Sequence, residues 1–297
     1  MQGREGMEQT KKRKIVRKSE KISLGIILAI FFIYAATLVF PFLWLIVNSG
    51  RGYLEFFLKP MALPENWFAN LVNYAVIFRE FDMLEMAYNS VFLSAAQPTV
   101  SIFFTTCVAY AYARHEFRLK KALYVVALIP MVVAVAGTMP ASYRLINDIG
   151  MYDNMYYFVL TSTGGFGINF LLIASVFQNV SGTYKEAAEI DGAGQWTIFL
   201  RIYVPQASSI ITAMWILSFI ATWNDYMTPY LYLPSYKTLS TGIYFLQAQI
   251  EVGNGEYVGD YPKLFAAMVI AILPVIVLFL CFQKTIMSYS FGGGIKE

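Results

Sequence analysis

Residues 181–205, SGTYKEAAEIDGAGQWTIFLRIYVP, form a polar stretch rich in small side chains between two long apolar segments. Thr183 followed three residues later by Glu186 matches the capping box, in which each side chain bonds a backbone N–H at the start of a helix. We therefore expect a short helix to begin here. Gly192 and Gly194 favour a C-terminal stop, so this helix should run about two turns.

The same stretch predicts a second short helix after this turn. Four apolar side chains recur at i, i+3, i+4 and i+7: Trp196, Phe199, Leu200 and Tyr203. They form one face suited to the membrane surface, and Pro205 stands where the following helix would start. A compact helix with small side chains can enter a groove on another protein, and the apolar helix behind it would tie that contact to the membrane. The alternative is an ordinary loop with a helical turn.

The spacing in this stretch resembles the EAA loop of permease subunits of binding-protein-dependent ABC importers. That pattern reads Glu-Ala-Ala, three residues, Gly, nine residues, Ile, one residue, Leu, Pro. The chain follows it from Glu186 to Pro205, with Val204 in the place of Leu. The additional Asp191 and Ala193 resemble the carbohydrate branch of the family, that of the maltose and multiple-sugar transporters.

This resemblance implies an all-α membrane protein with six transmembrane helices, the type I ABC importer permease fold and a cytoplasmic coupling helix. It implies that the chain forms half of an oligosaccharide path with a second, different permease subunit, and that an extracytoplasmic solute-binding protein delivers the sugar. ATP and Mg²⁺ would bind a separate ATPase dimer, so this subunit would be non-catalytic and without a cofactor. The ATPase-coupling residues would be Thr183, Glu186, Ala187, Ala188, Asp191, Gly192 and Ala193.

The composition independently excludes an ordinary soluble domain. The 297 residues are 58% hydrophobic and only 14% charged, with a mean hydropathy of +0.54, which is the profile of a polytopic membrane protein. A bilayer span needs about twenty apolar residues. The segments that meet this need are 22–48, 86–113, 122–143, 155–180, 206–233 and 264–284.

The basic residues predict the orientation of these spans. If the amino terminus is cytoplasmic, sixteen Lys and Arg fall in the inner segments and six in the outer loops, as the positive-inside rule requires. Both termini would then lie on the cytoplasmic side of a bacterial cell membrane. We expect a basic leader (1–21), a transmembrane domain (22–288) and a cytoplasmic tail (289–297). The leader is better explained as a topology anchor near anionic lipid than as a nucleic-acid site.

Two predicted spans carry a polar stripe along one helical face. In the second span the stripe consists of Ser90, Ser94, Gln97, Ser101 and Thr105. In the fifth span it consists of Ser208, Thr212, Trp215, Ser218, Thr222 and Asp225. Such stripes either line a substrate path or hold neighbouring helices together by hydrogen bonds. We favour the path for Gln97, Trp215 and Asp225.

The end of the fifth span, WNDYMTPYL at 223–231, resembles the fifth-helix signature of the family, which lies at the outer end of its translocation cavity. Aromatic, amide and carboxylate groups together suit a sugar, whose ring faces stack while its hydroxyls need donors and acceptors. The substrate-path residues that we predict are Gln97, Ser101, Trp215, Ser218, Thr222, Asn224, Asp225 and Tyr226. Asp225 is the only acidic residue inside a predicted span, near its outer end.

Two further segments resemble contact regions of the family. The long outer loop 234–263 resembles the loop that reaches into the solute-binding protein, and its contact residues would be Tyr244, Gln247, Gln249 and Glu251. The tail 290–297, SFGGGIKE, resembles the Gly-rich terminal segment that touches the ATPase; an unconstrained tail is the alternative.

Two other classes of protein stand as alternatives. A self-sufficient secondary transporter needs intramembrane ionisable residues for ion coupling, and only Asp225 is available. A membrane-embedded enzyme needs a paired acid and base, an activated nucleophile or a metal set. His115 is the only histidine, and Cys107 and Cys281 fall at the inner ends of predicted spans, so we predict no metal site and no disulfide.

Overall fold

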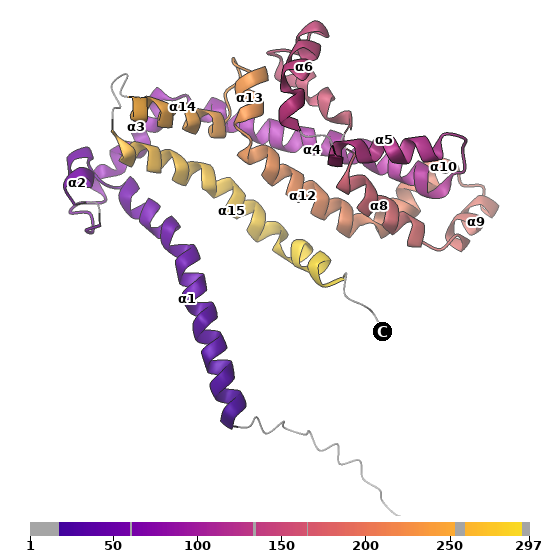
Figure 1. The fold of residues 1–297 in the computed structure, drawn as a ribbon, viewed down its shortest axis with the longest axis horizontal. Helices are drawn as coiled ribbons and strands as arrows, with labels where there is room; N and C mark the ends of the chain where they lie inside the picture. Colours follow the sequence, from indigo (N-terminus) through magenta and orange to yellow (C-terminus); the bar gives the residue numbers. More distant parts are fainter. Residues whose placement is uncertain (1–17, 60, 133–134, 165, 253–258, 293–297) are drawn as a thin grey trace, which may run out of the picture.

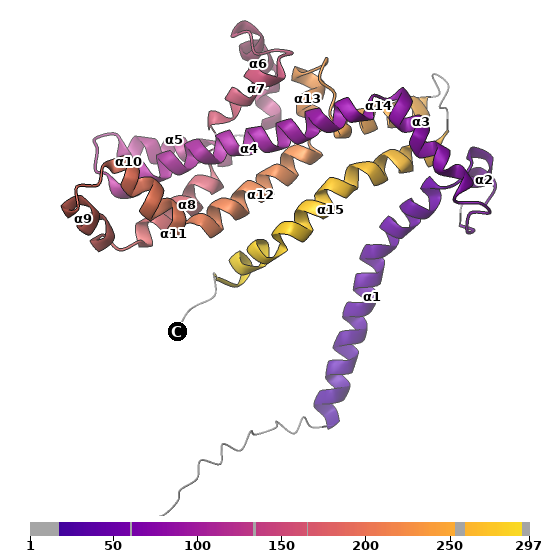
Figure 2. The same ribbon diagram turned by 180° about the vertical axis from the view of Figure 1, so that it is seen from behind.

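The computed structural model describes residues 18–59, 61–132, 135–164, 166–252 and 259–292. These ranges form helices joined by short connections and contain no β-strand. The longest helices are α1 (Lys18–Ser49), α4 (Met83–Arg114) and α15 (Tyr261–Gly292). Figures 1 and 2 show α4, α12 (Ser208–Asn224) and α15 running alongside one another, whereas α1 diverges from them.

Three of the described helices are each long and apolar enough to cross a bilayer: Ser23–Ser49, Met83–Arg114 and Tyr261–Gln283. Three bent pairs pass the same test when each pair is counted as one span. Helices α5 (Lys120–Val132) and α6 (Val135–Asp148) are one such pair, with a bend of 115°. The expected six spans are therefore present if each pair crosses once, but the third, fourth and fifth are broken helices.

The second bent pair consists of α7 (Met155–Phe158) with η2 (Val159–Gly164), followed by α8 (Ile168–Asn179), with a bend of 53°. Gly167 at the start of α8 has a φ of +76°, a conformation that glycine adopts at little cost. Its N–H donates to the carbonyl of Ala127 at 2.8 Å. The break therefore fixes α8 against α5.

The two ends of the bundle carry different helices. Helices α2 (Tyr53–Leu58), α3 (Val72–Glu80) and α14 (Leu239–Val252) lie at one end, and α9 (Thr183–Ile190) lies at the other (Figures 1 and 2). The segments predicted to be outer and inner are thus separated by the length of the long helices.

The long outer loop that we expected at 234–263 is largely helical. Helix α14 takes up fourteen of its residues, and Leu239, Leu246 and Ile250 on it are buried. These side chains recur at helical spacing and pack against α4 and α15, which explains why the segment is not irregular. Residues 1–17 of the predicted leader lie outside the described residues. Helix α15 continues to Gly292, so it enters the predicted tail.

Helix α1 is held to the rest of the described chain at its C-terminal end. Its side chains from 23 to 43 are exposed, whereas Asn48, Ser49 and Arg51 are buried. The Asn73 amide donates to the carbonyls of Ser49 and Arg51, each at 2.9 Å. Gly50 lies directly against the indole of Trp67. The angle of α1 is therefore set by this small packed corner.

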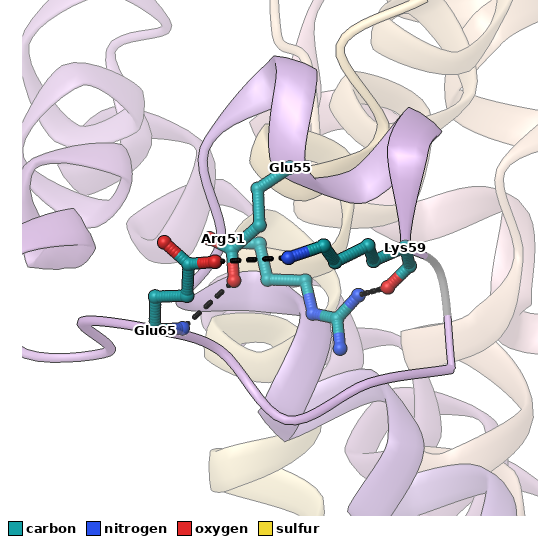
Figure 3. Close-up of polar contacts among 4 residues, drawn as sticks. All are labelled: Arg51, Glu55, Lys59 and Glu65. Carbon is teal, nitrogen blue, oxygen red and sulfur yellow. Dashed lines mark hydrogen bonds and ion pairs between the residues drawn. The ribbon is translucent and has the colours of Figure 1, made fainter.

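A buried arginine closes the same corner (Figure 3). Arg51 is 1% exposed, and its Nη1 donates to the carbonyl of Lys59, while no described carboxylate pairs with it. Lys59 instead pairs with Glu65 at 3.1 Å, and the Glu65 N–H donates to Glu55 Oε1 at 2.8 Å. These contacts tie α2 to the chain that follows it.

Candidate functional site

Helix α9 is an exposed helix at the end of the bundle that we predict to be cytoplasmic. None of its residues is buried, and the side chain of Ile190 is 86% exposed. Of the residues predicted for ATPase coupling, five are exposed: Thr183, Glu186, Ala187, Asp191 and Gly192. Ala188 and Ala193 are half-buried and pack against the apolar core. One side of α9 is thus anchored and the other is free for contact.

The start of α9 differs from the expected capping box. The helix begins at Thr183, and the preceding Gly182 offers no side chain that caps it. A capping side chain must belong to the residue before the first helical one, so Thr183 stands one position too late. Its hydroxyl instead lies 2.5 Å from the Ser181 hydroxyl. The prediction of a capping box is wrong, although the helix itself is present.

The predicted stop at Gly192 is present. Gly192 has a φ of +78°, its N–H donates to the carbonyl of Glu189 at 3.1 Å, and the N–H of Ala193 donates to that of Ala188 at 2.9 Å. These two bonds are those of a Schellman motif, which places a left-handed residue just after the helix. The turn therefore depends on Gly192.

The helix after this turn is present but wound differently. It consists of α10 (Gln195–Ile198), η3 (Phe199–Tyr203), which has π-helical bonding, and α11 (Val204–Gln206). Phe199 and Tyr203 are buried, whereas Trp196 and Leu200 are 67% and 53% exposed. The expected single apolar face is therefore split. The i→i+5 bonding of a π-helix rotates these positions away from the 3.6-residue repeat.

Tyr203 links this inner segment to two spans. Its ring is fully buried, with centroids 5.0 Å from Tyr110 of α4 and 6.0 Å from Phe177 of α8. The guanidinium of Arg114 lies 4.9 Å from the Tyr203 centroid, and Arg114 also donates to the carbonyl of Val180. A displacement of α9 and η3 would therefore be passed to α4 and α8.

A polar cavity of about 330 Å³ lies between α4, η2 and α12. Its lining residues are Gln97, Pro98, Ser101, Thr161, Ser162, Ser218 and Thr222. Four of them are predicted path residues, brought together from two helices that are far apart in sequence. Thr161 and Ser162 were missed, because they precede the glycine run and belong to neither stripe; a hydroxyl-rich TST sequence was the available signal.

The side chains in this cavity have unused hydrogen-bonding groups. The Thr161 hydroxyl donates to the carbonyl of Phe158 at 2.7 Å. Within the described part of the chain, no hydrogen bond is made by the half-buried side chains of Gln97, Ser101, Ser162, Ser218 and Thr222. Half-buried polar groups of this kind need water or a polar ligand as a partner. The cavity can thus receive a molecule rich in hydroxyl groups.

Asp225 lies beside this cavity. It does not line the cavity itself, but with Gln97 and Thr222 it lines a small neighbouring void of about 10 Å³. Its Oδ1 accepts a hydrogen bond from the N–H of Thr228 at 3.0 Å, at the start of α13 (Met227–Tyr232). Asp225 follows the last residue of α12, so it is not inside a membrane helix. Its carboxylate therefore makes a structural hydrogen bond and does not line the polar cavity.

The other three predicted path residues lie elsewhere. The Trp215 indole donates to the hydroxyl of Thr99 at 2.9 Å, and Trp215 does not line the polar cavity. Asn224 and Tyr226 line a separate, mainly apolar cavity of about 830 Å³ among α1, α12, α14 and α15. The backbone at Asp225 is extended, with ψ near 110°, so helical spacing ends there and no longer relates Tyr226 to the stripe. Trp215 and Asn224 lie within α12 itself, at positions that do not line the polar cavity.

Ser90, at one end of the α4 stripe, holds two helices together. Ser90 Oγ accepts a hydrogen bond from the N–H of Leu239 at 2.7 Å, which fixes the start of α14 against α4. Ser94 and Thr105 are buried. The interpretation that the stripe holds helices together therefore applies to Ser90, and the substrate path stays a prediction for the residues that line the polar cavity.

The residues predicted to contact a binding protein all lie on α14 and are exposed. Tyr244, Gln247 and Glu251 share one face, where the Gln247 amide donates to Glu251 at 2.8 Å. The Tyr244 ring stacks on Tyr226, with centroids 4.8 Å apart. Gln249 points to a different face, because it lies two residues from either neighbour. These four residues do not form a single patch.

Comparison with known proteins adds independent information. Residues 101–287 match the family model described as binding-protein-dependent transport system inner membrane component. The chain is 27% identical over 298 residues to the maltose/maltodextrin transport system permease protein of Photorhabdus laumondii, covering 94% of this chain and 98% of that protein. It is 26% identical over 261 residues to the diacetylchitobiose uptake system permease protein of Streptomyces coelicolor, covering 87% and 84%.

A solved structure shares the fold. It is that of a bacterial ABC transporter involved in the import of the acidic polysaccharide alginate, with a TM-score of 0.75, 23% identity and coverage of 90% of this chain and 97% of that chain. The family model spans more than half of the present chain and includes α9 and α12. The expected fold and family are confirmed. This chain belongs to the family of inner membrane components of binding-protein-dependent transport systems.

Proposed function

We propose that the chain is a permease subunit of an ATP-driven carbohydrate importer and forms half of the substrate path. The observation that carries the proposal is the polar cavity, where five side chains with unused hydrogen-bonding groups meet between apolar helices. Sugar hydroxyls both donate and accept hydrogen bonds, so they complement hydroxyl and amide side chains. The names of the relatives, for maltose/maltodextrin and diacetylchitobiose, support the same substrate class.

Energy would enter through α9. The exposed side of this helix, with Glu186 and Ala187, would occupy a groove on a separate ATPase dimer. Closure of that dimer would displace α9, and the contacts of Tyr203 with Tyr110 and Arg114 would pass the displacement to α4. Helix α4 also contains Gln97, which lines the polar cavity. Two sites would then be coupled through one rigid element that has two positions.

The remaining partners follow from the two ends of the bundle. An extracytoplasmic solute-binding protein would dock on the end that carries α14, and the ATPase on the end that carries α9. Both chain termini would be cytoplasmic. A second permease subunit would complete the path. A secondary transporter has less support, because Asp225, the only acidic residue in a predicted span, does not line the polar cavity and accepts a backbone hydrogen bond at the start of α13.

Reconstitution tests this proposal. Proteoliposomes that contain the chain with its partner permease, ATPase and binding protein should accumulate oligosaccharide only when ATP is supplied. Glu186→Lys should abolish uptake, because it reverses a charge on the exposed side of α9, while the complex keeps its normal elution volume and unfolding temperature. Unchanged uptake by this variant would refute coupling through α9. Uptake driven by an ion gradient without ATP would refute the proposal as a whole.

A further inference from the structure

Asp153, in the short connection between α6 and α7, has a strained backbone. Its φ is +51°, in the left-handed region that glycine enters freely and that residues with a Cβ enter at an energetic cost. Glycine would fit this backbone with less strain. The side chain of Asp153 is therefore the feature that needs an explanation.

Asp153 is bonded three times to the segment that follows α13. Its N–H donates to the carbonyl of Tyr232 at 2.8 Å. Its Oδ1 accepts the N–H of Ser235 at 2.9 Å, and its Oδ2 accepts the Ser235 hydroxyl at 2.7 Å. We call these three bonds the Asp153 clamp. Both carboxylate oxygens thus bind one residue that is far away in the sequence, in the region where α13 lies beside α6 (Figures 1 and 2).

The Asp153 clamp joins two of the three elements that line the polar cavity. One half of the clamp leads through α7 into η2, which contributes Thr161 and Ser162 to the lining. The other half follows α12 and α13, and α12 contributes Ser218 and Thr222. Each half of the clamp is therefore continuous with one wall of the cavity.

Apolar contacts also hold these two walls. The Phe158 ring stacks on Tyr232, with centroids 5.5 Å apart, and Met155 and Leu233 are buried in the same cluster. Apolar burial has no preferred direction, so it brings α7 and α13 together without fixing their relative position. Hydrogen bonds require a defined distance and angle. The clamp is therefore the contact that can fix where η2 stands relative to α12.

We propose, on the basis of the proposed function, that Asp153 is a positioning residue for the saccharide path. Its carboxylate holds η2 against α12, so the hydroxyls of Thr161 and Ser162 stand at a fixed separation from that of Thr222. Binding groups must be held within about 0.5 Å of their productive positions to act together on one ligand. Without the clamp the same hydroxyls would line the cavity but would hold a saccharide less firmly.

Three substitutions separate the carboxylate from the backbone. Asp153→Gly removes the carboxylate and relaxes the left-handed backbone, so its effect cannot come from strain. Asp153→Asn is the conservative variant, because its amide oxygen can accept the Ser235 N–H and its NH₂ can donate to the Ser235 hydroxyl. Asp148→Gly is the matched control. Asp148 is an exposed carboxylate at the end of α6, and its side chain makes no hydrogen bond or ion pair within the described residues.

The first measurement requires no transport. Leu160→Cys in η2 and Leu217→Cys in α12, both at exposed positions, carry spin labels in a background with Cys107→Ser and Cys281→Ser. Double electron–electron resonance on the complex of both permeases with the ATPase dimer in nanodiscs measures the distance between the two labels. Asp153→Gly should shift and broaden the distance distribution, whereas Asp153→Asn and Asp148→Gly should keep that of the wild type. An unchanged distribution in Asp153→Gly would overturn the inference.

The second measurement is the number of ATP molecules hydrolysed per saccharide taken up by proteoliposomes. The probes are maltotriose and diacetylchitobiose, chosen from the saccharides named for the relatives. Asp153→Gly should raise this ratio about threefold, because a saccharide that is held less firmly leaves the path while ATP hydrolysis continues. Asp153→Asn should restore the wild-type ratio.

A purely structural role would lower uptake and ATP hydrolysis together and leave their ratio unchanged, which would overturn the inference. The proposed function fails in a different way. If the wild-type complex took up neither probe when ATP was supplied, that result would count against the proposed function, and the spin-label distances would still decide whether Asp153 positions η2.

Discussion

Thr222 shows how a single polar side chain decides what a membrane helix can face. Its hydroxyl is half-buried at a cavity and makes no hydrogen bond within the described chain. Thr106 of α4 differs from it. Its hydroxyl is buried and donates to the carbonyl of Ile102, one turn earlier in α4, at 2.6 Å. The two threonines are chemically identical, but only Thr222 has a group to offer to a substrate.

Replacing Thr222 by valine should therefore weaken transport without unfolding the protein. Valine has nearly the same shape and removes one hydrogen bond, so the apparent affinity for transported oligosaccharide should fall about fivefold. Initial uptake rates in proteoliposomes over a range of substrate concentrations measure this. Thr106→Val serves as the control and should keep the wild-type affinity. An equal loss in both variants would contradict the role of the cavity.

Gly50 is required by packing at the end of α1. A Cβ at this position would lie 2.1 Å from the Trp67 ring, closer than non-bonded atoms approach. Gly50→Ala should lower the free energy of unfolding by about 1–3 kcal/mol through overpacking. Gly25→Ala, where a Cβ meets nothing within 4 Å, should be neutral or slightly stabilising. The unfolding temperatures of the two variants of the purified complex measure this difference. An unchanged unfolding temperature for Gly50→Ala would contradict tight packing of Gly50 against Trp67.

At the scale of elements, α9 depends on its C-terminal turn more than on its start. The turn has the two hydrogen bonds of a Schellman motif and a left-handed glycine, whereas the start has no side-chain cap. The half-buried Ala188 and Ala193 flank this turn and contact the core. The turn therefore sets how α9 is presented to a partner.

Gly192→Ala should disturb this presentation. A left-handed alanine costs about 1–2 kcal/mol, which should fray the end of α9 and reduce substrate-stimulated ATP hydrolysis by the assembled complex. Gly182→Ala is the control, because Gly182 is right-handed with a φ of −63° and has room for a Cβ. Hydrogen exchange of the α9 amides reports the fraying directly. Equal exchange in the two variants would contradict the importance of the turn.

For the whole molecule, the separation of α9 and α14 to opposite ends predicts opposite accessibility in cells. Single cysteines at Thr197 and Gln249, both exposed, should react with a membrane-impermeant maleimide from the cytoplasmic and outer sides, respectively. The background is Cys107→Ser with Cys281→Ser, which removes the natural thiols. Labelling of both positions from one side would contradict the proposed topology.

Much of this architecture is readable from local sequence. Hydropathy identifies the spans because each bilayer crossing needs its own apolar run. The motif around Glu186 and the stop at Gly192 are likewise properties of neighbouring residues. The capping box failed because it requires the helix to begin one residue later than it does, a difference too small for spacing alone to resolve.

The polar cavity between α4, η2 and α12 is a different kind of feature. The polar stripes on α4 and α12 were visible in the sequence, but Ser218 and Thr222 meet Gln97 only because the helices pack side by side. Thr161 joins them because a broken span turns its hydroxyl-bearing segment inward.

The sequence by itself determined the membrane class, the approximate spans and the presence of helix α9, since hydropathy and motif spacing are local properties. Only the tertiary structure decided which polar residues share a cavity and which hold helices together. The extended backbone at Asp225 ends one stripe, and the π-helical turn at 199–203 splits an apolar face. Both are departures from regular helical geometry. A prediction from residue periodicity assumes regular geometry, so it does not anticipate such departures.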